Sequence, residues 1–478
     1  MKKCIFMWAL SMLAFIYVGA TPVSLDSCRQ MALKNNKSLR MADEAIAGAG
    51  FTRKAAHAAY LPGIDFTATY MLNQRKIQLL SEDAMLPTMS FDPATGKYNY
   101  NILTSPDGSP IKDPASGSYI PTEVAVIPKD AMSFDTRNVV AGAFTLTQPV
   151  YMGGQIRALN DIARYGEELA YTSRKVAEQE LVYTVDEAYW LVVSLKEKEK
   201  LAKSFEGLVD SLKNNVEALL RNGMATKADV LTVEVKLNEA RIAVTKVSNG
   251  LSLARMALAQ LCGLPIHEPM ILSDEDLLSE AEYPVLPQFD MADVYAGRQD
   301  LELIRKSILL LEGKEKLTLS AMLPKVVIIG AYTFSNPNVI NGFQKKFGGG
   351  FSIGAALTIP LWHWGGNYNQ YKAAKSSTAA QRLLLEDAEE KVQLQVGQAK
   401  FNFQEAYKTL DMTISNMKSA DENLRMAQLA YREGFLTLDD VTAAQTAWLQ
   451  AHSEKLDAEI GVRLCNVYLA KVLGILKY

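Results

Sequence analysis

The residues of this chain that could bind metals or act as nucleophiles are few and lie far apart. Its four histidines show no metal-ligand spacing; they are His57, His267, His363 and His452. No nucleophile elbow, pair of carboxylates or Cys/His arrangement indicates catalysis. The run Gly348-Gly349-Gly350 lacks the Lys-Ser/Thr of a phosphate-binding loop, so we expect a flexible loop there. The sequence therefore predicts no metal, no cofactor and no enzymatic activity.

The cysteines indicate packing rather than redox chemistry. Cys4 lies in a segment that we expect to be removed, which leaves Cys28, Cys262 and Cys465. Three thiols do not make a disulfide framework. Cys262 and Cys465 stand among apolar residues near the ends of helical stretches, so we expect them to be buried as small hydrophobic side chains.

Two turn sequences repeat glycine, threonine and aspartate at the same spacing. RNGMATKADV at 221–230 aligns with REGFLTLDDV at 432–441 without a gap. The glycine can adopt the positive φ that ends a helix. The threonine is expected to cap the returning helix, and the aspartate lies in its first turn, where the helix dipole favours an acid. These residues are Gly223, Thr226 and Asp229 in the first turn, and Gly434, Thr437 and Asp440 in the second.

The distribution of proline identifies the helices that hold these turns. Proline breaks a helix interior, and none occurs from Val150 to Leu264 or from Leu361 to Tyr478. Apolar residues recur at helical spacing in the first segment, with charged residues between them. Each segment is interrupted once, at its turn sequence. We therefore predict two long helical hairpins, over about 154–262 and 366–476.

Four strand candidates flank the hairpins. Each has roughly the 8 to 10 residues that a tilted strand needs to cross a bilayer. A long polar loop separates the first two strands, and a short loop separates the last two. The strands are expected at about 64–72, 140–147, 326–334 and 351–359.

The chain is internally duplicated, since three segments of its first half recur in order in its second half. Besides the turns, LTQPVYMGG at 146–154 matches LTIPLWHWGG at 357–366, and QLCGLP at 260–265 matches KVLGIL at 471–476. Each copy reads helix, Leu-Pro, strand, loop, strand, Pro, Gly-Gly, helical hairpin. The chain therefore contains one supersecondary unit twice.

The duplication sets the domain organisation that we predict. The first repeat covers 21–264, a linker covers 265–290, and the second repeat covers 291–478. Proline and glycine mark the passage from strand to helix in each repeat. These transition residues are Pro149, Gly153 and Gly154 in the first copy, and Pro360, Gly365 and Gly366 in the second.

The N-terminus predicts export. Lys2 and Lys3 precede an apolar run from Ile5 to Val18, and small residues follow, which is the pattern of a cleaved signal peptide over 1–20. No later stretch is long and apolar enough for a membrane helix, so a membrane crossing would have to use strands. The formal net charge of −3 gives no electrostatic footprint for nucleic acid.

Four strands per chain cannot close on themselves in a membrane. Membrane barrels begin at about eight strands, and an open sheet would leave unpaired edges in lipid. Membrane strands would therefore require an oligomer. A dimer would give a barrel with a filled interior, whereas a trimer of four-stranded chains would leave room for a channel.

In their order, these features resemble the TolC family of outer-membrane efflux channels. The resemblance rests on the opening SLDSCRQMALKNNKSL, the two Leu-Pro turns, the two Pro-to-Gly-Gly strand ends and the paired G-x-x-T-x-x-D-V turns. It covers essentially the whole mature chain. It implies a mixed α and β fold and a homotrimer in the outer membrane of a Gram-negative bacterium. A twelve-stranded β-barrel would be continuous with a long periplasmic α-helical barrel of coiled-coil helices.

The resemblance also implies partners. The six turn residues would lie at the periplasmic tip and contact a periplasmic adaptor (membrane fusion) protein, which would join the channel to an inner-membrane transporter. Asp440 matches a position that lines an acidic ring at the family's pore aperture, where three carboxylates would favour cations. The family's second acidic position is Ala443 here, a residue with no carboxylate to contribute to a second ring.

Small-molecule efflux is the function that we favour from the sequence. An outer-membrane channel for type I protein or peptide secretion is the alternative, since it would use the same fold. A periplasmic coiled-coil scaffold is a remote alternative, and it would fractionate as soluble protein. Trp362 and Trp364, just after a strand end, are expected in an aromatic belt at the lipid interface.

Overall fold

The computed structural model describes residues 22–267, 270–275, 288–338 and 344–476. The chain forms two compact units. The helical unit takes residues up to 56, 157–318 and 369 onward, and the strand unit takes 57–156 and 319–368. The predicted signal peptide at 1–20 lies outside the described residues, as do parts of the predicted linker at 265–290.

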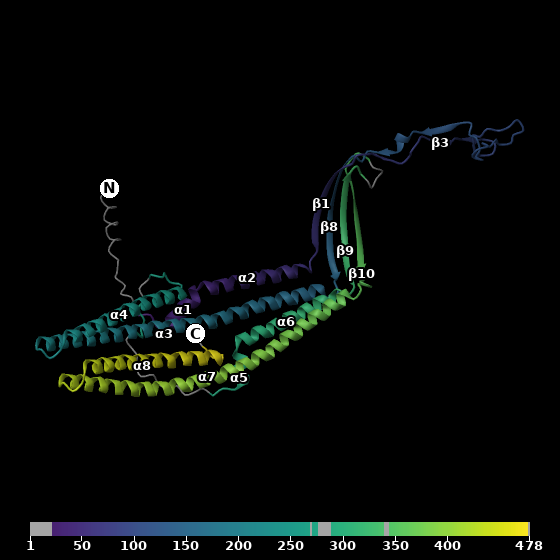
Figure 1. Ribbon diagram of the computed structural model, residues 1–478. Coiled ribbons are helices and arrows are strands. Elements are labelled where there is room, and N and C mark those ends of the chain that lie inside the picture. The colour runs from purple at the N-terminus through teal and green to yellow at the C-terminus, as the bar shows by residue number, and fades with distance from the viewer. Residues whose placement is uncertain (1–21, 268–269, 276–287, 339–343, 477–478) are drawn as a thin grey trace, which may run out of the picture. The chain divides into compact units, whose positions relative to one another are not determined.

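Two helical hairpins dominate the helical unit (Figure 1). The long arms are α3 (Gln155–Arg221) and α7 (Gly366–Arg432), each of 67 residues, or about 100 Å at 1.5 Å per residue. The returning arms are α4 (Lys227–Leu261) and α8 (Leu438–Val472), each of 35 residues. The breaks between the arms fall at the two predicted turn sequences, and the equal lengths follow from the duplication.

Shorter helices precede the strands in each copy. They are α1 (Leu25–Asn35) and α2 (Lys37–Ala58) in the first copy, and α5 (Met291–Gly297) and α6 (Gln299–Ser320) in the second. The residue between the two short helices reaches the end of its own hairpin in both copies. Asn36 Nδ2 donates to the carbonyl of Leu261 at 3.0 Å, and Arg298 Nη1 donates to that of Val472 at 3.2 Å. The predicted internal repeat is therefore confirmed, down to individual contacts.

Each hairpin is held at this end by an apolar core. The first core gathers side chains from α1, α3 and α4, with Val185, Tyr189 and Leu258 fully buried. One polar contact lies beside it. The buried carboxylate of Asp186 on α3 accepts hydrogen bonds from Arg29 Nε at 2.7 Å and from Arg29 Nη2 at 2.5 Å. Because an unpaired buried charge costs several kcal/mol, this ion pair fixes how α1 sits on α3.

The strand unit is built on one antiparallel sheet of four strands in the order β1-β8-β9-β10 (Figure 1). The strands are β1 (Gly63–Leu72), β8 (Asn138–Tyr151), β9 (Lys325–Asn336) and β10 (Gly348–Thr358). The prediction of a flexible loop at Gly348-Gly349-Gly350 was wrong, because these glycines begin β10 and pair with residues 333–335 near the end of β9. A Cβ at Gly349 would lie 2.7 Å from the Tyr332 hydroxyl, so close packing explains at least that glycine.

The segment between β1 and β8 is a ribbon of short paired strands rather than the long polar loop that we expected (Figure 1). Its apolar residues are widely exposed, including Met85, Phe91 and Tyr98. The pairs are β2 (Ile77–Gln78) with β7 (Ser133–Phe134), β3 (Ala84–Pro87) with β6 (Val124–Ile127), and β4 (Met89–Asp92) with β5 (Lys97–Tyr100); η1 (Lys129–Met132) precedes β7.

The strand-to-helix transitions use left-handed backbone. Gly153 and Gly154 have φ of 63° and 82°, Gly365 has 72°, and Trp364 before it has 49°. Pro149 lies at a register shift of β8, where a missing N–H is tolerated. Pro360 and Gly366 also lie at the predicted transition, since Pro360 follows the end of β10 and Gly366 begins α7.

The two glycines of the first transition differ in their surroundings, which yields a matched pair of variants. Alanine at either position meets backbone strain of about 1–2 kcal/mol. At Gly153 its Cβ would also lie 2.8 Å from Leu323 Cβ and 2.9 Å from the carbonyl oxygen of Ser320, whereas Gly154 faces open space. We expect Gly153→Ala to lower the melting temperature of the purified protein more than Gly154→Ala does. Equal melting temperatures would contradict this packing.

Candidate functional site

The two faces of the sheet differ in chemistry, because facing residues of paired strands lie on the same side. One register row crosses all four strands with aromatic residues: Phe66, Phe144, Tyr332 and Phe351. The neighbouring row on that face holds Ile64, Leu146, Gly330 and Ile353. This face is therefore apolar and aromatic across the whole width of the sheet.

The opposite face carries small and polar residues. One row holds Asp65, Thr145, Ala331 and Ser352, and the next holds Thr67, Ala143, Thr333 and Gly350. Such residues leave the backbone thinly covered and are compatible with water. The alternation along each strand matches the period-2 pattern of a sheet between an apolar and an aqueous phase.

The apolar face is packed within itself yet remains open to its surroundings. Phe334 lies over Gly142, where a Cβ would come within 2.4 Å of its ring. The rings of Phe66 and Phe144 are 4.7 Å apart between centroids. Even so, Phe351 and Ile353 are 71% and 72% exposed. A contiguous apolar surface of this kind marks contact with a membrane or a partner. None of the helices in the described part of the chain is long and apolar enough to span a membrane.

The two hairpin turns are closed by identical capping boxes. Asp229 N donates to Thr226 Oγ1 at 3.2 Å, and Asp229 Oδ2 accepts from Thr226 N at 2.7 Å. In the second turn, Asp440 N donates to Thr437 Oγ1 at 3.3 Å, and Asp440 Oδ2 accepts from Thr437 N at 2.9 Å. The predicted N-cap threonines are thus confirmed.

Glycines and exposed carboxylates complete these turns. Gly223 and Gly434 have φ of 74° and 78°, as expected for residues that end a helix. Hydrogen bonds from Thr226 and Thr437 hold the pKa of Asp229 and of Asp440 below the usual aspartate range. Asp440 is exposed, so its carboxylate both caps α8 and faces solvent.

Sequence reasoning missed the apolar residues at the same turns. Met224 is 68% exposed and Phe435 is 82% exposed, and the two occupy equivalent positions directly after the helix-ending glycine. An apolar side chain held in water in both copies indicates a contact surface. The signal was available in the aligned turn sequences, where each glycine is followed by a large apolar residue.

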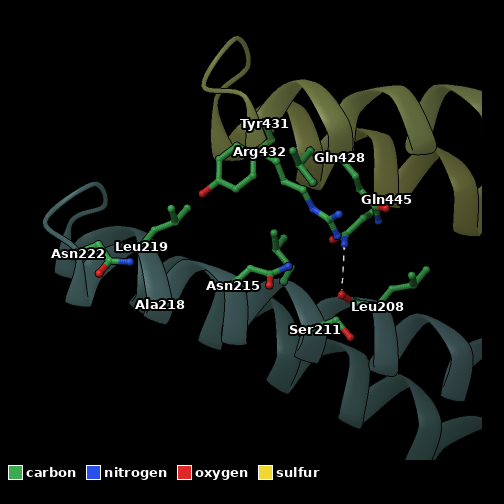
Figure 2. Close-up of a pocket in the computed structure, with 12 residues that line it drawn as sticks. Leu208, Ser211, Asn215, Ala218, Leu219, Asn222, Gln428, Tyr431, Arg432 and Gln445 are labelled. Carbon is green, nitrogen blue, oxygen red and sulfur yellow. Dashed lines mark hydrogen bonds between the residues drawn. The ribbon is translucent and has the colours of Figure 1, made fainter.

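A cavity of about 370 Å³ lies between the two hairpins near their turns (Figure 2). Leu219 and Asn222 reach it from α3 and its end, while Gln428 and Tyr431 reach it from α7. Beside it, Gln445 Nε2 of α8 donates to the carbonyl of Leu208 on α3 at 3.4 Å. This cavity could not be predicted from the sequence, because its walls come from residues more than 200 positions apart.

A four-stranded sheet with one lipid-compatible face, joined twice to capped helical hairpins, defines a TolC-like outer-membrane factor. The chain belongs to the outer membrane efflux protein family, whose model matches residues 128–264 and 296–474. No sequence among the curated proteins matches the chain.

Solved structures share the fold at low sequence identity. CusC is 14% identical with a TM-score of 0.70, and the match covers 94% of this chain and 91% of CusC. VceC from Vibrio cholerae is 15% identical with a TM-score of 0.68, covering 94% and 96% of the two chains. The Campylobacter jejuni CmeC outer-membrane channel is 16% identical with a TM-score of 0.68, covering 94% and 85%. The predicted fold class is therefore confirmed.

The capping boxes generate a prediction for stability. Loss of an N-cap costs about 1 kcal/mol, so Thr226→Ala or Thr437→Ala is expected to lower the free energy of unfolding by roughly that amount. Thr→Ser at the same positions keeps the hydroxyl and should stay near wild type. Denaturant unfolding followed by circular dichroism measures the difference. If alanine and serine variants were equally stable, the caps would not contribute as described.

The same boxes predict the sign of the pH dependence. Because the aspartate pKa is lowered in the folded state, this stabilisation is present above the ordinary value of about 3.9. It is lost as the pH falls through the lowered folded value. The alanine variants should therefore differ most from wild type near neutral pH and least in strong acid.

Proposed function

We propose that this chain is the outer-membrane channel of a tripartite efflux pump. It serves as a passive exit duct for small molecules that an inner-membrane transporter delivers through a periplasmic adaptor. The two-faced sheet is the observation that carries the proposal: Phe351 and Ile353 on one face suit lipid, and Thr67 and Ser352 on the other suit a water-filled lumen. The repeats that we place at 21–264 and 291–478 each supply half of this sheet.

A homotrimer completes the membrane segment. The outer strands β1 and β10 each have one strand partner in the described sheet. Their outward edges would leave backbone groups unpaired in hydrocarbon. We propose that β10 of one copy pairs with β1 of the next, so that three copies close a barrel of twelve strands with a central lumen.

Small inward residues explain a duct rather than a selective pore. The threonine, serine, alanine and glycine of these rows provide no hydrophobic constriction. Asp65 is the acid in the two inner rows described above, so three copies would add one ring of carboxylates among otherwise uncharged side chains of those rows. The choice of cargo then lies with the transporter and the adaptor.

The hairpin turns supply the adaptor contact in this proposal. Met224 and Phe435 present apolar surface beside the capped turns, and the contact includes Gly223, Thr226 and Asp229 with their counterparts Gly434, Thr437 and Asp440. Asp440 also lines the pore aperture, where its three copies would attract cations. The turns thus lie at the periplasmic tip.

The sheet yields a test with a matched control in the adjacent residue. A lysine facing lipid costs about 2–4 kcal/mol near the bilayer midplane, whereas a lumen-facing lysine does not. We expect Ile353→Lys to reduce the amount of folded trimer in the outer-membrane fraction sharply. Ser352→Lys, one position away on the other face, should assemble nearly as well as wild type. The reverse order, or equal loss, would mean that the faces are assigned wrongly.

The function is tested by the accumulation of a fluorescent pump substrate in cells that lack the gene. Accumulation should rise on deletion and fall when the wild-type gene is restored. Gly434→Val strains the positive φ of the turn, so it should restore efflux poorly while trimer assembly persists. Gly434→Asn, which tolerates that backbone, should restore efflux better.

The outcomes separate the competing functions. Full efflux with Gly434→Val would mean that the turn does not contact the adaptor. No change on deletion, in a strain without a related channel, would favour type I secretion of protein or peptide as the cargo. A soluble rather than membrane-bound product would favour the periplasmic scaffold.

A further inference from the structure

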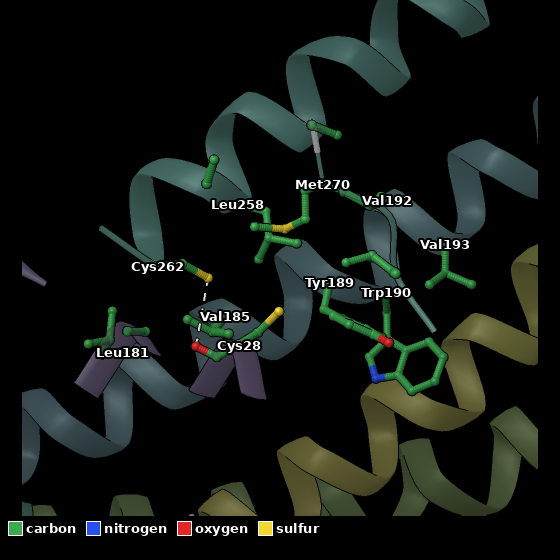
Figure 3. Close-up of a cluster of buried hydrophobic side chains, with 14 of the residues drawn as sticks. Cys28, Leu181, Val185, Tyr189, Trp190, Val192, Val193, Leu258, Cys262 and Met270 are labelled. Carbon is green, nitrogen blue, oxygen red and sulfur yellow. Dashed lines mark hydrogen bonds between the residues drawn. The ribbon is translucent and has the colours of Figure 1, made fainter. Parts of the chain in front are cut away.

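Two cysteines that are 234 positions apart in the sequence lie together in the first apolar core (Figure 3). Cys28 is on α1 and Cys262 caps the C-terminal end of α4. Both side chains are 0% exposed. The Cys262 thiol donates to the carbonyl oxygen of Cys28 at 3.7 Å.

The ends of α1 and α4 are held in contact independently of the sulfur atoms. Asn36, the cap of α1, donates its side-chain N–H to the carbonyl of Leu261 at 3.0 Å. A Cβ at Gly263 would lie 2.5 Å from Cβ of Asn35, so the two chain segments touch directly. The position of Cys28 is also fixed from the other side, because its neighbour Arg29 is bound to the buried Asp186.

Packing alone does not require sulfur at this corner. In the second repeat the position of Cys262 is taken by Leu473, which is buried in the corresponding core with Val294. In both copies the residue after the first short helix donates from its side chain to the last carbonyl of the hairpin, and leucine occupies the cysteine position in the second. The sulfur pair is therefore a feature that the first copy carries in addition to its apolar packing.

We propose that Cys28 and Cys262 form a disulfide bond that joins α1 to the end of the first hairpin in the exported protein. An outer-membrane protein passes through the periplasm, where disulfides form and persist. The proposal requires export only, and does not depend on what the channel carries. It assigns Cys465, which is partly exposed on α8, as the remaining free thiol.

The reaction is a thiol–disulfide exchange with a protein disulfide of the oxidising compartment as the oxidant. One cysteine sulfur, as thiolate, attacks that disulfide and forms a mixed disulfide. The second cysteine then displaces the oxidant's sulfur. The S–S bond between Cys28 and Cys262 forms, and the oxidant's S–S bond is reduced to two thiols, which take up the two protons. The neighbouring Cys262 side chain, together with burial, raises the pKa of the Cys28 thiol. Exchange therefore belongs to the folding stage, before α1 covers the pair.

The bond would act chiefly on the unfolded chain. A cross-link over a long loop removes much of the conformational freedom of the unfolded state. It would also tie α1 to α4 covalently, while Arg29 and Asp186 tie α1 to α3 by an ion pair. Both arms of the first hairpin would then be fixed at the end opposite the turn.

Thiol counting on the full-length protein tests the bond. Cells are quenched in acid, and the protein is unfolded and labelled with a maleimide-polyethylene glycol, with and without prior reduction. We expect reduction to add two labels to wild type and two to Cys465→Ser, but none to Cys28→Ser. Peptide mass spectrometry should find Cys28 linked to Cys262. Equal labelling of wild type with and without reduction, or a link to Cys465, would overturn the proposal.

A melting experiment keeps the test independent of variants that fold poorly. Reductant should lower the melting temperature of wild type when it is present throughout unfolding. It should leave Cys262→Leu, which copies the second repeat, unchanged. An equal effect of reductant on both proteins would overturn the proposal, whereas neither result bears on the efflux assay.

Discussion

One constraint governs the fold. A single sheet with an apolar face and two open edges is unfavourable in water because of its face, and in lipid because of its edges. Phe66, Phe144, Tyr332 and Phe351 form an aromatic row on one face. Within the described part of the chain, β1 and β10 each pair with a strand on one side only. Hydrocarbon satisfies the face but not the edges, since lipid cannot hydrogen-bond to backbone. Pairing of edge strands between copies would satisfy both, which is the physical reason for the homotrimer that we propose.

Because the chain is duplicated, the same local interactions form twice. Each copy caps its returning helix with the same Thr-x-x-Asp box. Each ties the residue after its first short helix to the end of its hairpin, through Asn36 and through Arg298. The compact units nevertheless cut across the repeats, since every repeat gives its strands to one unit and its hairpin to the other. Symmetry in sequence therefore does not correspond to separate folding bodies.

The two copies differ in the segment between their strands and at the end of the hairpin opposite the turn. The first inserts a paired ribbon between its strands, whereas the second joins its strands over a much shorter stretch. At the end of its hairpin the first copy has Cys262 beside Cys28, whereas the second has Leu473 at the position of Cys262. At the turns Met224 and Phe435 remain apolar and exposed in both. The two copies are therefore alike at the hairpin turns. They differ at the opposite end of the hairpin and in the segment between the two strands.

Local rules in the sequence determined most of the elements. Proline-free segments set the hairpins, because proline cannot lie inside a helix, and the turn residues set the caps at Thr226 and Thr437. The duplication was also visible in the sequence, and the fold class could be predicted from the order of its repeated segments. Tertiary structure alone decided what depends on register and long-range contact. It placed Phe66 and Phe351 in one row, formed the cavity between α3 and α7, paired the glycines at 348–350 within a strand, and brought Cys28 to Cys262. Spacing along a chain fixes periodicity, but it does not say which distant residues meet.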